Sequence, residues 1–505
     1  MPTRTIKKFT VPLVGPYNTR FSAVNATDST SGYIGTGIIG SMIIGKSTQS
    51  TDKDSRFINC FAQVVSDPIS GKRRSYVVKR PGFATGTTPA AGEKGYAILV
   101  WTGQGTGTKV MSAFGATNST LYDGTTSKGA ITGQCTGITE TTISGTATLA
   151  ISSADNTGWY YPDAGALTEI TSTNWPGDSL TVVGTFAHMD GFAFIMTSNA
   201  RIYASDLNSI TGWTANNYAN VNVYPDKGIG CIRWKNYVMA FGPESVEFWR
   251  NAGATPFPLA RVIEMTQKVG AVSATAISRI ADTIFWCGTT PEGGMSIFQW
   301  NGQISRLSVP EIEAIMILAG ASNISLTTIR FYGRSFVLVK AGPTTLAYCL
   351  EEKMWHEWQS TTPLWVKCTA VMTGGTVVNY AVSDVSTAGK VYVMNLASLV
   401  FTDDGTTYTA RVQTADEDEG TNSTKFYSYL DILGDVESSA STLTISASDD
   451  DFATYDVLGT VDLSDQHRRI TRLGSARSRS WVFTHAAATP MRLEHGEGLV
   501  EIGTD

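Results

Sequence analysis

The residue pattern closest to a known ligand-binding motif lies at residues 40–47, where Gly40, Gly45, Lys46 and Ser47 match G-x-x-x-x-G-K-(S/T). In a P-loop, this pattern places backbone amides around phosphate, and it requires a buried strand before it and a helix after it. Here the motif is followed by TQSTDKDS, which is a poor helix former, and no β-α-β pattern follows. The G-x-G-x-x-G match at residues 35–40 fails the same requirement. We interpret both as parts of a glycine-rich loop and predict no nucleotide cofactor.

The residue types that bind metals or act as nucleophiles are scattered along the chain. The sequence contains no H-E-x-x-H, no C-x-x-C and no G-x-S-x-G, and its five histidines lack metal-ligand spacing. We therefore predict no catalytic residue, no metal site and no cofactor. The six cysteines lie mostly in apolar, strand-like segments, which favours buried free thiols, with disulfides as the alternative. They are Cys60, Cys135, Cys231, Cys287, Cys349 and Cys368.

Two segments resemble the Asp-box hairpin of sialidases. One is residues 446–455, SASDDDFATY, and the other begins at Ser205-Asp206 and ends at Gly212-Trp213. This box is a structural turn and not a catalytic site. A glycosidase also needs two carboxylates facing each other across a cleft, and the sequence alone cannot place such a pair.

Two N-terminal segments are candidates for an interface. The basic segment at residues 72–80 could bind phosphates or pair with an acidic protein surface, and we favour the protein surface. The glycine-rich segment 32–45 is apolar and would promote aggregation if exposed, so we expect it to pack on another surface. The predicted interface residues are Lys72, Arg73, Arg74, Lys79, Arg80, Ile38, Ile39, Met42 and Ile43. A second basic cluster, at residues 468–479, is expected to pair with aspartates of its own domain.

The elements that must position these residues are predicted to be short strands. The clearest unit is residues 180–213, in which Asp190-Gly191 is a strong turn signal between two apolar, alternating segments. Similar units recur from about residue 91 to 400, seven in all, at intervals of roughly 30–50 residues, as in propeller arrays. One helix is predicted at residues 310–318, with a proline in its first turn.

We therefore predict an all-β fold with a β-propeller of six or seven blades. A single four-stranded sheet cannot bury both of its faces, whereas sheets stacked in a ring bury them against one another. A linear array of β-sandwiches is the alternative, because alternation alone does not report ring closure. The expected division is an N-terminal docking region of extended chain and strands at 1–90, the propeller at 91–400 and an antiparallel β-sandwich at 401–505.

Charge is distributed unevenly along the chain, whose net charge is −6. Residues 1–90 carry 12 basic and 4 acidic side chains, whereas residues 401–505 carry 8 basic and 19 acidic ones. This polarity suits partners at both ends better than a single DNA-binding face. No segment approaches the roughly 18 apolar residues of a membrane span, so we expect a soluble protein made in a reducing cytoplasm.

Three short motifs in this order resemble one family. They are Arg56, Asn59 and Phe61 in one strand, then Arg80-Pro81-Gly82-Phe83, and finally residues 472–477 before a tryptophan strand. With the propeller-like middle, this order is similar to the packaged-DNA stabilisation proteins, or tail hub (nozzle) proteins, of short-tailed bacteriophages. The resemblance covers nearly the whole chain, although each motif is short.

The resemblance implies a structural role in the virion tail, with assembly in the host cytoplasm. Such proteins form rings of about six copies below the portal adaptor, extend the DNA channel, help to retain the genome and carry tailspikes or fibres. The expected partners are therefore other copies of this chain, the adaptor, a tailspike or fibre, and passing double-stranded DNA contacted without sequence specificity. A carbohydrate-binding or glycoside-cleaving propeller is the alternative, and a P-loop nucleotide binder is a third hypothesis.

Overall fold

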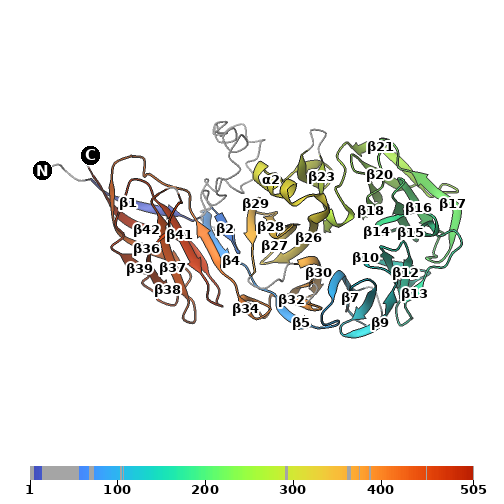
Figure 1. Ribbon diagram of the computed structural model, residues 1–505, viewed down its shortest axis with the longest axis horizontal. Helices are drawn as coiled ribbons and strands as arrows, with labels where there is room; N and C mark the ends of the chain where they lie inside the picture. Colours follow the sequence, from blue (N-terminus) through green and yellow to red (C-terminus); the bar gives the residue numbers. More distant parts are fainter. Residues whose placement is uncertain are drawn as a thin grey trace. The chain divides into compact units, whose positions relative to one another are not determined.

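The computed structural model describes residues 5–13, 56–66, 73–102, 105, 107–289, 294–360, 366–374, 376–385, 388–450 and 452–503. Its regular structure consists almost entirely of strands, as Figure 1 shows. The chain divides into two compact units. The sandwich unit comprises Met1–Pro81, Glu352–Gln359 and Thr407–Asp505, and the propeller unit comprises Gly82–Glu351 and Ser360–Thr406.

The propeller unit contains six four-stranded antiparallel sheets, together with the strands β26, β27 and β28. The first five sheets follow the chain order, four strands to a sheet. Their strands are β6 (Lys94–Trp101), β7 (Lys109–Gly115), β8 (Ser119–Asp123), β9 (Thr126–Ile131), β10 (Cys135–Ile143), β11 (Thr146–Ser153), β12 (Gly158–Pro162), β13 (Thr168–Glu169), β14 (Val182–Met189), β15 (Phe192–Thr197), β16 (Arg201–Ser205), β17 (Trp213–Asn220), β18 (Gly230–Trp234), β19 (Tyr237–Phe241), β20 (Val246–Asn251), β21 (Leu259–Gln267), β22 (Ile277–Ile280), β23 (Thr283–Thr289), β24 (Met295–Trp300) and β25 (Ile304–Arg306).

The rest of the propeller unit closes the ring. After β25 come β26 (Ile324–Phe331), β27 (Arg334–Ala341) and β28 (Thr344–Cys349), and the last sheet contains β30 (Val366–Gly374), β31 (Thr376–Ser383) and β32 (Val391–Asn395). The fourth strand of that last sheet is β5 (Ala84–Thr87), which precedes β6 in the chain and pairs antiparallel with β32. The last sheet thus contains a strand from the segment that leads directly into the first sheet. Backbone hydrogen bonds therefore close the ring, and the linear array of sandwiches is excluded. Short 3-10 turns, η1 (Pro176–Asp178), η2 (Ala274–Ala276) and η3 (Ala321–Asn323), and the hairpin β33 (Thr402–Asp403) and β34 (Thr406–Thr407) complete this part.

Tight hairpins between the first and second strands set the register of successive sheets. In four consecutive sheets the first turn residue has a positive φ: Asp190 (52°), Lys235 (50°), Ala281 (47°) and Tyr332 (50°). Such turns match the right-handed twist of the strands they join. The sequence indicated the turn at Asp190-Gly191. Ala281 and Tyr332 are not residue types that favour a positive φ, and strand pairing imposes this conformation on them.

Apolar side chains fill the spaces between sheets. One cluster joins β18–β20 to β23 and β24 and contains Trp234, Phe248, Trp286 and Trp300. The rings of Phe248 and Trp300 lie 4.7 Å apart, and those of Trp234 and Trp300 lie 5.7 Å apart. These contacts make the tryptophans core residues of neighbouring sheets, as propeller packing requires.

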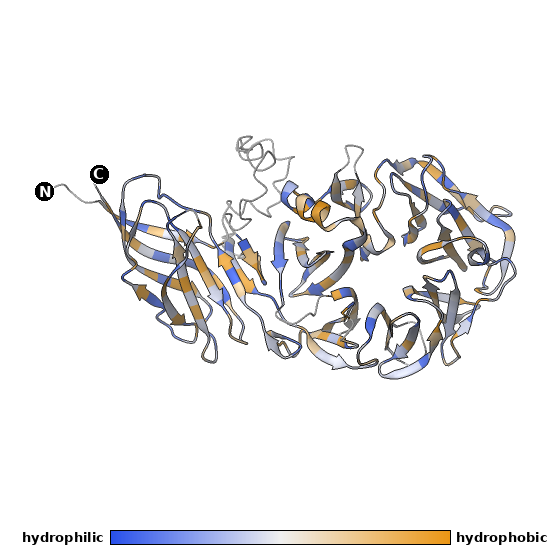
Figure 2. Cartoon of the chain, viewed as in Figure 1, coloured by the Kyte–Doolittle hydropathy of each residue, from blue (hydrophilic) through white to orange (hydrophobic). Residues whose placement is uncertain are grey.

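The helix α2 (Pro310–Ala319) is the α-helix of the described residues and begins and ends close to the prediction. Its buried Glu313 accepts hydrogen bonds from Ser296 (2.8 Å), Ser308 (2.7 Å) and Arg306 Nε (2.7 Å). These bonds, with buried Ile312 and Met316, fix one face of the helix against the propeller. Figure 2 shows how hydrophobic residues are distributed over this helix and the strands.

The sandwich unit is assembled from segments far apart in the sequence. One sheet has the order β3-β4-β42-β36-β39, with β1 beside β42 and β40 beside β36; the strands of the other follow the order β29-β2-β35-β41-β37-β38. The strands are β1 (Thr5–Pro12), β2 (Arg56–Ile58), β3 (Cys60–Ser66), β4 (Arg73–Lys79), β29 (Met354–Trp358), β35 (Ala410–Gln413), β36 (Lys425–Gly434), β37 (Thr442–Ser448), β38 (Asp456–Asp462), β39 (Arg469–Thr471), β40 (Ser475–Ala476), β41 (Ser480–His485) and β42 (Arg492–Ile502).

Side chains from both sheets of the sandwich unit form one core. Phe9 of β1 lies against Trp481 and Tyr427, with ring centroids 6.0 and 5.3 Å apart. The all-β fold with a propeller and a sandwich is thus confirmed, and the sandwich pairs are antiparallel except for β2 with β29, which is parallel. The division at residue 90 differs from the compact units, because β1 to β4 share sheets and core with the C-terminal strands. Alternating apolar residues reveal a strand but not its partner.

Candidate functional site: the basic segments and the first strands of the propeller

The predicted N-terminal interface residues fall into three groups in the structure. Lys72 and the apolar residues Ile38, Ile39, Met42 and Ile43 lie outside the described residues, as does the P-loop-like segment. Arg73 and Arg74 are in β4, and the Arg74 side chain is exposed. Lys79 and Arg80 are fully buried. The prediction that Lys79 and Arg80 belong to an exposed interface is therefore corrected: their side chains lie in the interior of the sandwich unit.

Arg80 is held by hydrogen bonds and aromatic rings. Its guanidinium donates to Asn59 Oδ1 (2.9 Å), to the Pro81 carbonyl (3.1 Å) and to the Gln359 carbonyl (3.1 Å). The ring centroids of Tyr408 and Trp358 lie 4.0 and 4.9 Å from the guanidinium carbon. A buried cation is tolerated only when its donors are satisfied in this way.

Asn59 explains why the motif pairs it with Arg80. Its backbone is left-handed, with φ 54°, a conformation that asparagine adopts more readily than most residues. Its amide nitrogen donates to the Thr409 carbonyl (2.8 Å), and its amide oxygen accepts from Arg80 and from the Gln359 backbone (2.8 Å). Nearby, Arg56 forms an ion pair with Glu357 at 2.7 Å. The first two family motifs therefore join segments of the sandwich unit that are about 300 residues apart in the chain.

The remaining motif residues also have structural roles. In the propeller unit, a Cβ at Gly82 would lie 2.0 Å from the Thr402 carbonyl oxygen, so no larger residue fits there, and Phe83 is buried. In the motif at 472–477, Arg472 and Gly474 have positive φ values of 62° and 74° and lie in the connection between β39 and β40. The Arg477 carbonyl accepts a hydrogen bond from Lys425.

The basic cluster at residues 468–479 pairs within its own unit, as predicted. Arg469 binds Asp431 through two hydrogen bonds of 2.6 Å, and buried Arg479 binds Asp449 at 2.7 and 2.6 Å. The Asp-box-like segment at 446–455 is a turn: Asp450 accepts hydrogen bonds from Ser448 and from the backbone and hydroxyl of Thr454.

The titratable residues are placed for packing. His356 is fully buried between Phe57 and Phe61, and burial lowers its pKa to about 3. Burial, with the nearby Lys79 charge, lowers the pKa of His485 to about 4. Burial raises the pKa of the Cys135, Cys231, Cys287 and Cys368 thiols to about 12, and all six cysteines are unpaired thiols. Within the described ranges, no three histidine, cysteine or carboxylate side chains gather as a metal site would require.

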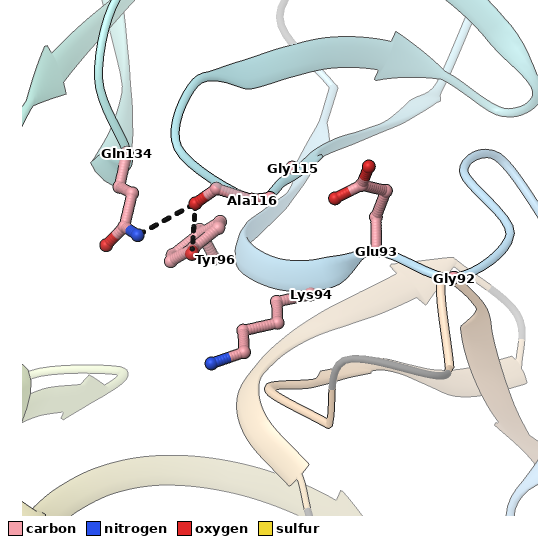
Figure 3. A pocket seen from close by; sticks show the side chains of 7 residues that line it. All are labelled: Gly92, Glu93, Lys94, Tyr96, Gly115, Ala116 and Gln134. Carbon is pink, nitrogen blue, oxygen red and sulfur yellow. Dashed lines mark hydrogen bonds between the residues drawn. The ribbon is translucent and has the colours of Figure 1, made fainter.

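A small cavity of about 160 Å³ lies at the start of the first sheet (Figure 3). Its lining includes Glu93, Lys94, Tyr96, Ala116 and Gln134. The Tyr96 hydroxyl (3.1 Å) and the Gln134 amide (2.8 Å) both donate to the Ala116 carbonyl. Figure 3 shows Lys94 and Glu93 pointing away from each other. Sequence patterns did not indicate this cavity, and its lining offers a cation, a carboxylate and hydrogen-bonding groups.

The first strands of neighbouring sheets are bridged by side chains, so they line the centre of the ring. Thr136 and Thr139 of β10 donate to the carbonyls of Gly184 (3.2 Å) and Phe186 (2.8 Å) in β14. Thr275 and Thr328 make equivalent bonds between the segments of β22 and β26. In both pairs of bonds, the residue numbers rise together on the two bonded segments, so neighbouring first strands run in the same direction. Their hairpin ends therefore lie at the same end of the ring.

Among the helices of the described residues, none has the length and hydropathy that crossing a bilayer requires.

Comparisons with solved structures find propeller-sized matches of low similarity. A streptogramin B lyase structure matches at 11% identity over 63% of this chain and 97% of that chain, with a TM-score of 0.39. Raptor from Chaetomium thermophilum matches at 10% identity over 62% of this chain and 28% of that chain, with a TM-score of 0.40. A structure of BBS1N in complex with ARL6DN matches at 13% identity over 62% of this chain and 96% of that chain, with a TM-score of 0.39. These scores are too low to support a functional argument.

A search of curated proteins finds no match. A family model does match, across residues 59–394, and it is described as phage stabilisation, "Bacteriophage P22 Gp10, beta-propeller". The matched range begins at Asn59, contains the Arg80–Phe83 motif and covers nearly the whole ring. The chain therefore belongs to the bacteriophage P22 Gp10 β-propeller family of phage stabilisation proteins.

Proposed function

We propose that this protein is a hub of the phage tail, docked below the portal-adaptor ring, where it extends the DNA channel and helps to retain packaged DNA. The observation that carries the proposal is the family match over the propeller, which identifies a phage DNA-stabilisation protein. In this proposal about six copies form a ring in the virion tail, assembled in the host cytoplasm, and anchor tailspikes or fibres.

The roles of the buried polar residues support a mechanical function. Arg80, Glu313 and Arg479 each hold separate chain segments together, and none lies in an open cleft with a second reactive group. Backbone pairing of β5 with β32 makes the ring a closed body that can transmit force without opening. We propose that the protein acts through such rigid surfaces, with no chemical step.

Co-sedimentation with purified adaptor complexes tests this proposal. The full-length protein is mixed with adaptor rings and centrifuged through a density gradient at low and physiological salt. Co-migration in a fixed ratio is expected, and separate migration at both salt concentrations would contradict it. A polysaccharide-degradation assay on the same preparation is expected to show no activity. Activity would instead support the alternative of a glycoside-cleaving propeller.

Charge reversal at β4 tests the predicted basic interface. Arg73→Glu combined with Arg74→Glu changes two residues near the start of β4, and Arg74 is exposed. If an acidic partner surface contacts them, co-sedimentation should weaken by about tenfold or more, since charged hydrogen bonds contribute about 1.5–3 kcal/mol each. The matched control, Arg201→Glu combined with Arg250→Glu in β16 and β20, reverses the same number of charges. Equal binding by both variants would remove this surface from the proposal.

A further inference from the structure

Four consecutive first strands carry a basic residue at the same position. His188, Arg233, Arg279 and Arg330 each occupy the last position but one of β14, β18, β22 and β26, one residue before the hairpin turn begins. We call these four residues the basic arc. Sequence patterns did not single it out, because the four residues are 45 or more positions apart and the repeat is otherwise divergent.

Hydrogen bonds place the members of the basic arc next to one another. Arg233 donates to the His188 carbonyl at 3.3 Å, and Arg279 donates to the Arg233 carbonyl at 3.4 Å. The Arg279 carbonyl accepts from Thr328 at 3.1 Å, and Arg330 lies two residues further along the same strand. The four residues therefore follow the ring at one end of its centre, on neighbouring strands.

Nearby acids balance the charges of the basic arc only in part: Asp190 acts on His188 and Asp282 acts on Arg279. Among the ion pairs of the described residues, none involves Arg233, Arg279 or Arg330. Arg279 and Arg330 are exposed, and the buried Nε2 of His188 has no hydrogen-bond partner. Partial burial of the guanidinium, and after it the charge of Arg233, lower the pKa of Arg279, whereas the Asp282 carboxylate opposes this shift. Neighbouring guanidiniums that form no ion pair favour an external anion.

The surroundings favour carboxylates on a protein loop over a nucleic-acid backbone. Two acids lie in the adjoining hairpin turns: Asp190, which accepts a hydrogen bond from Asn251, and Asp282, whose side chain is 78% exposed and lies 4.0 Å from Lys235. A nucleic-acid strand carries a charge about every 3.4 Å and would bring phosphates against these carboxylates. A protein loop can instead place its acidic side chains away from Asp190 and Asp282 and donate backbone hydrogen bonds to these two carboxylates.

We propose that the basic arc is a docking site for an acidic loop of a partner protein, whose carboxylates bind the free donors of Arg279 and Arg330. This inference goes beyond the tail-hub role and does not depend on it, because it concerns the chemistry of one end of the propeller whatever the partner. If the protein failed to co-sediment with adaptor rings, the tail-hub proposal would be contradicted, but the proposed docking site would not.

Fluorescence anisotropy with defined probes tests the proposal on the full-length protein. The probes are fluorescein-labelled hexaglutamate and fluorescein-labelled single-stranded hexathymidylate, each titrated at low and physiological salt. Hexaglutamate is expected to bind at low salt, and R279Q/R330Q should weaken it by about tenfold or more, because charged hydrogen bonds are lost. The control R201Q/R250Q removes the same charge from β16 and β20 of the same unit and should bind like the unaltered protein.

Three outcomes would overturn the proposal. They are an absence of hexaglutamate binding at low salt, an equal loss in both double variants, and tighter binding of hexathymidylate than of hexaglutamate at physiological salt. The third would identify a nucleic-acid surface. Thermal unfolding followed by tryptophan fluorescence should match among the three proteins, which shows that the substitutions leave the fold intact.

Discussion

At the scale of single residues, burial decides what the charged and titratable groups do. Arg80 and Lys79 belong to a basic stretch that suggests a surface, yet both are inside the sandwich unit. Lys79 donates to the Ala487 carbonyl at 2.6 Å and contacts His485 Nδ1 at 3.3 Å. Such groups stabilise one arrangement of segments strongly, because any other arrangement leaves a buried charge without partners.

Replacing Arg80 by lysine should destabilise the sandwich unit. A lysine ammonium cannot reproduce the planar fork that reaches Asn59, Gln359 and two aromatic rings, so we expect a loss of about 3 kcal/mol in the free energy of unfolding. Urea unfolding monitored by tryptophan fluorescence measures it. Arg74→Lys in the same basic stretch is exposed and should change the unfolding midpoint little; equal effects of the two would contradict the assigned role of Arg80.

His356 should make stability depend on pH below neutrality. Its pKa is about 3 in the folded protein, against about 6.5 when unfolded, because burial disfavours the imidazolium. Its contribution is therefore fully present above about pH 6.5 and is lost progressively as the pH falls toward 3. At pH 4.5 the loss should be about 2–3 kcal/mol relative to pH 7. Both ring nitrogens are buried without partners, so His356→Phe should reduce this loss.

The control for this pH dependence is His467→Phe, since His467 is exposed. Urea midpoints measured at pH 7 and pH 4.5 compare the three proteins. An unchanged acid dependence in His356→Phe would show that other groups control the response.

At the scale of elements, the decisive contact is the pairing of β5 with β32. A short N-terminal strand completes a sheet whose other three strands lie about 300 residues later. Local turns fix each hairpin, but only this pairing turns a row of sheets into a ring. The Thr85 hydroxyl and Lys390 both bind Asp404, which adds side-chain contacts at the same place.

Gly86→Val should weaken the closure of the ring. A Cβ at Gly86 would lie 2.5 Å from Val393 Cγ2 and 3.0 Å from the Val391 carbonyl oxygen, so the strands must separate. We expect a loss of about 1–3 kcal/mol, as for other overpacked sites. Limited proteolysis should show faster cleavage near residues 82–95. Thr87→Val on the same strand is the control, and equal protection of both variants would contradict the role of this pairing.

At the scale of the whole molecule, the sandwich unit draws on both ends of the chain and on one internal segment. Strand β42 pairs with β36 on one side and with β1 and β4 on the other, while β35 pairs with β2 and β41. Strands without their partners expose unpaired backbone groups and apolar side chains.

A fragment comprising residues 401–505 should therefore fail to fold by itself. We expect it to lack a cooperative thermal transition and to bind a hydrophobic dye, because β1 to β4 and β29 are absent from its sheets. Co-expression with residues 1–90 should restore part of the cooperativity. Sharp, cooperative unfolding of the fragment alone would show that the C-terminal region at 401–505 is an independent domain.

Sequence alone determined the parts of this protein that depend on neighbouring residues. Alternating apolar residues and turn signals such as Asp190-Gly191 predicted the strands and their recurrence, and Pro310 with early acids predicted α2. Local sterics and hydrogen bonding set these features, so a short window of sequence contains their cause.

Only the tertiary structure decided which strands pair across long distances and which polar residues are inside. Nothing near Arg80 in the sequence shows that Gln359 and Tyr408 surround it, and nothing near Ala84–Thr87 shows that β32 is its partner. The basic arc is likewise a product of ring geometry, since His188, Arg233, Arg279 and Arg330 meet only when the sheets close. Long-range pairing depends on the fit of whole surfaces, which no local pattern records.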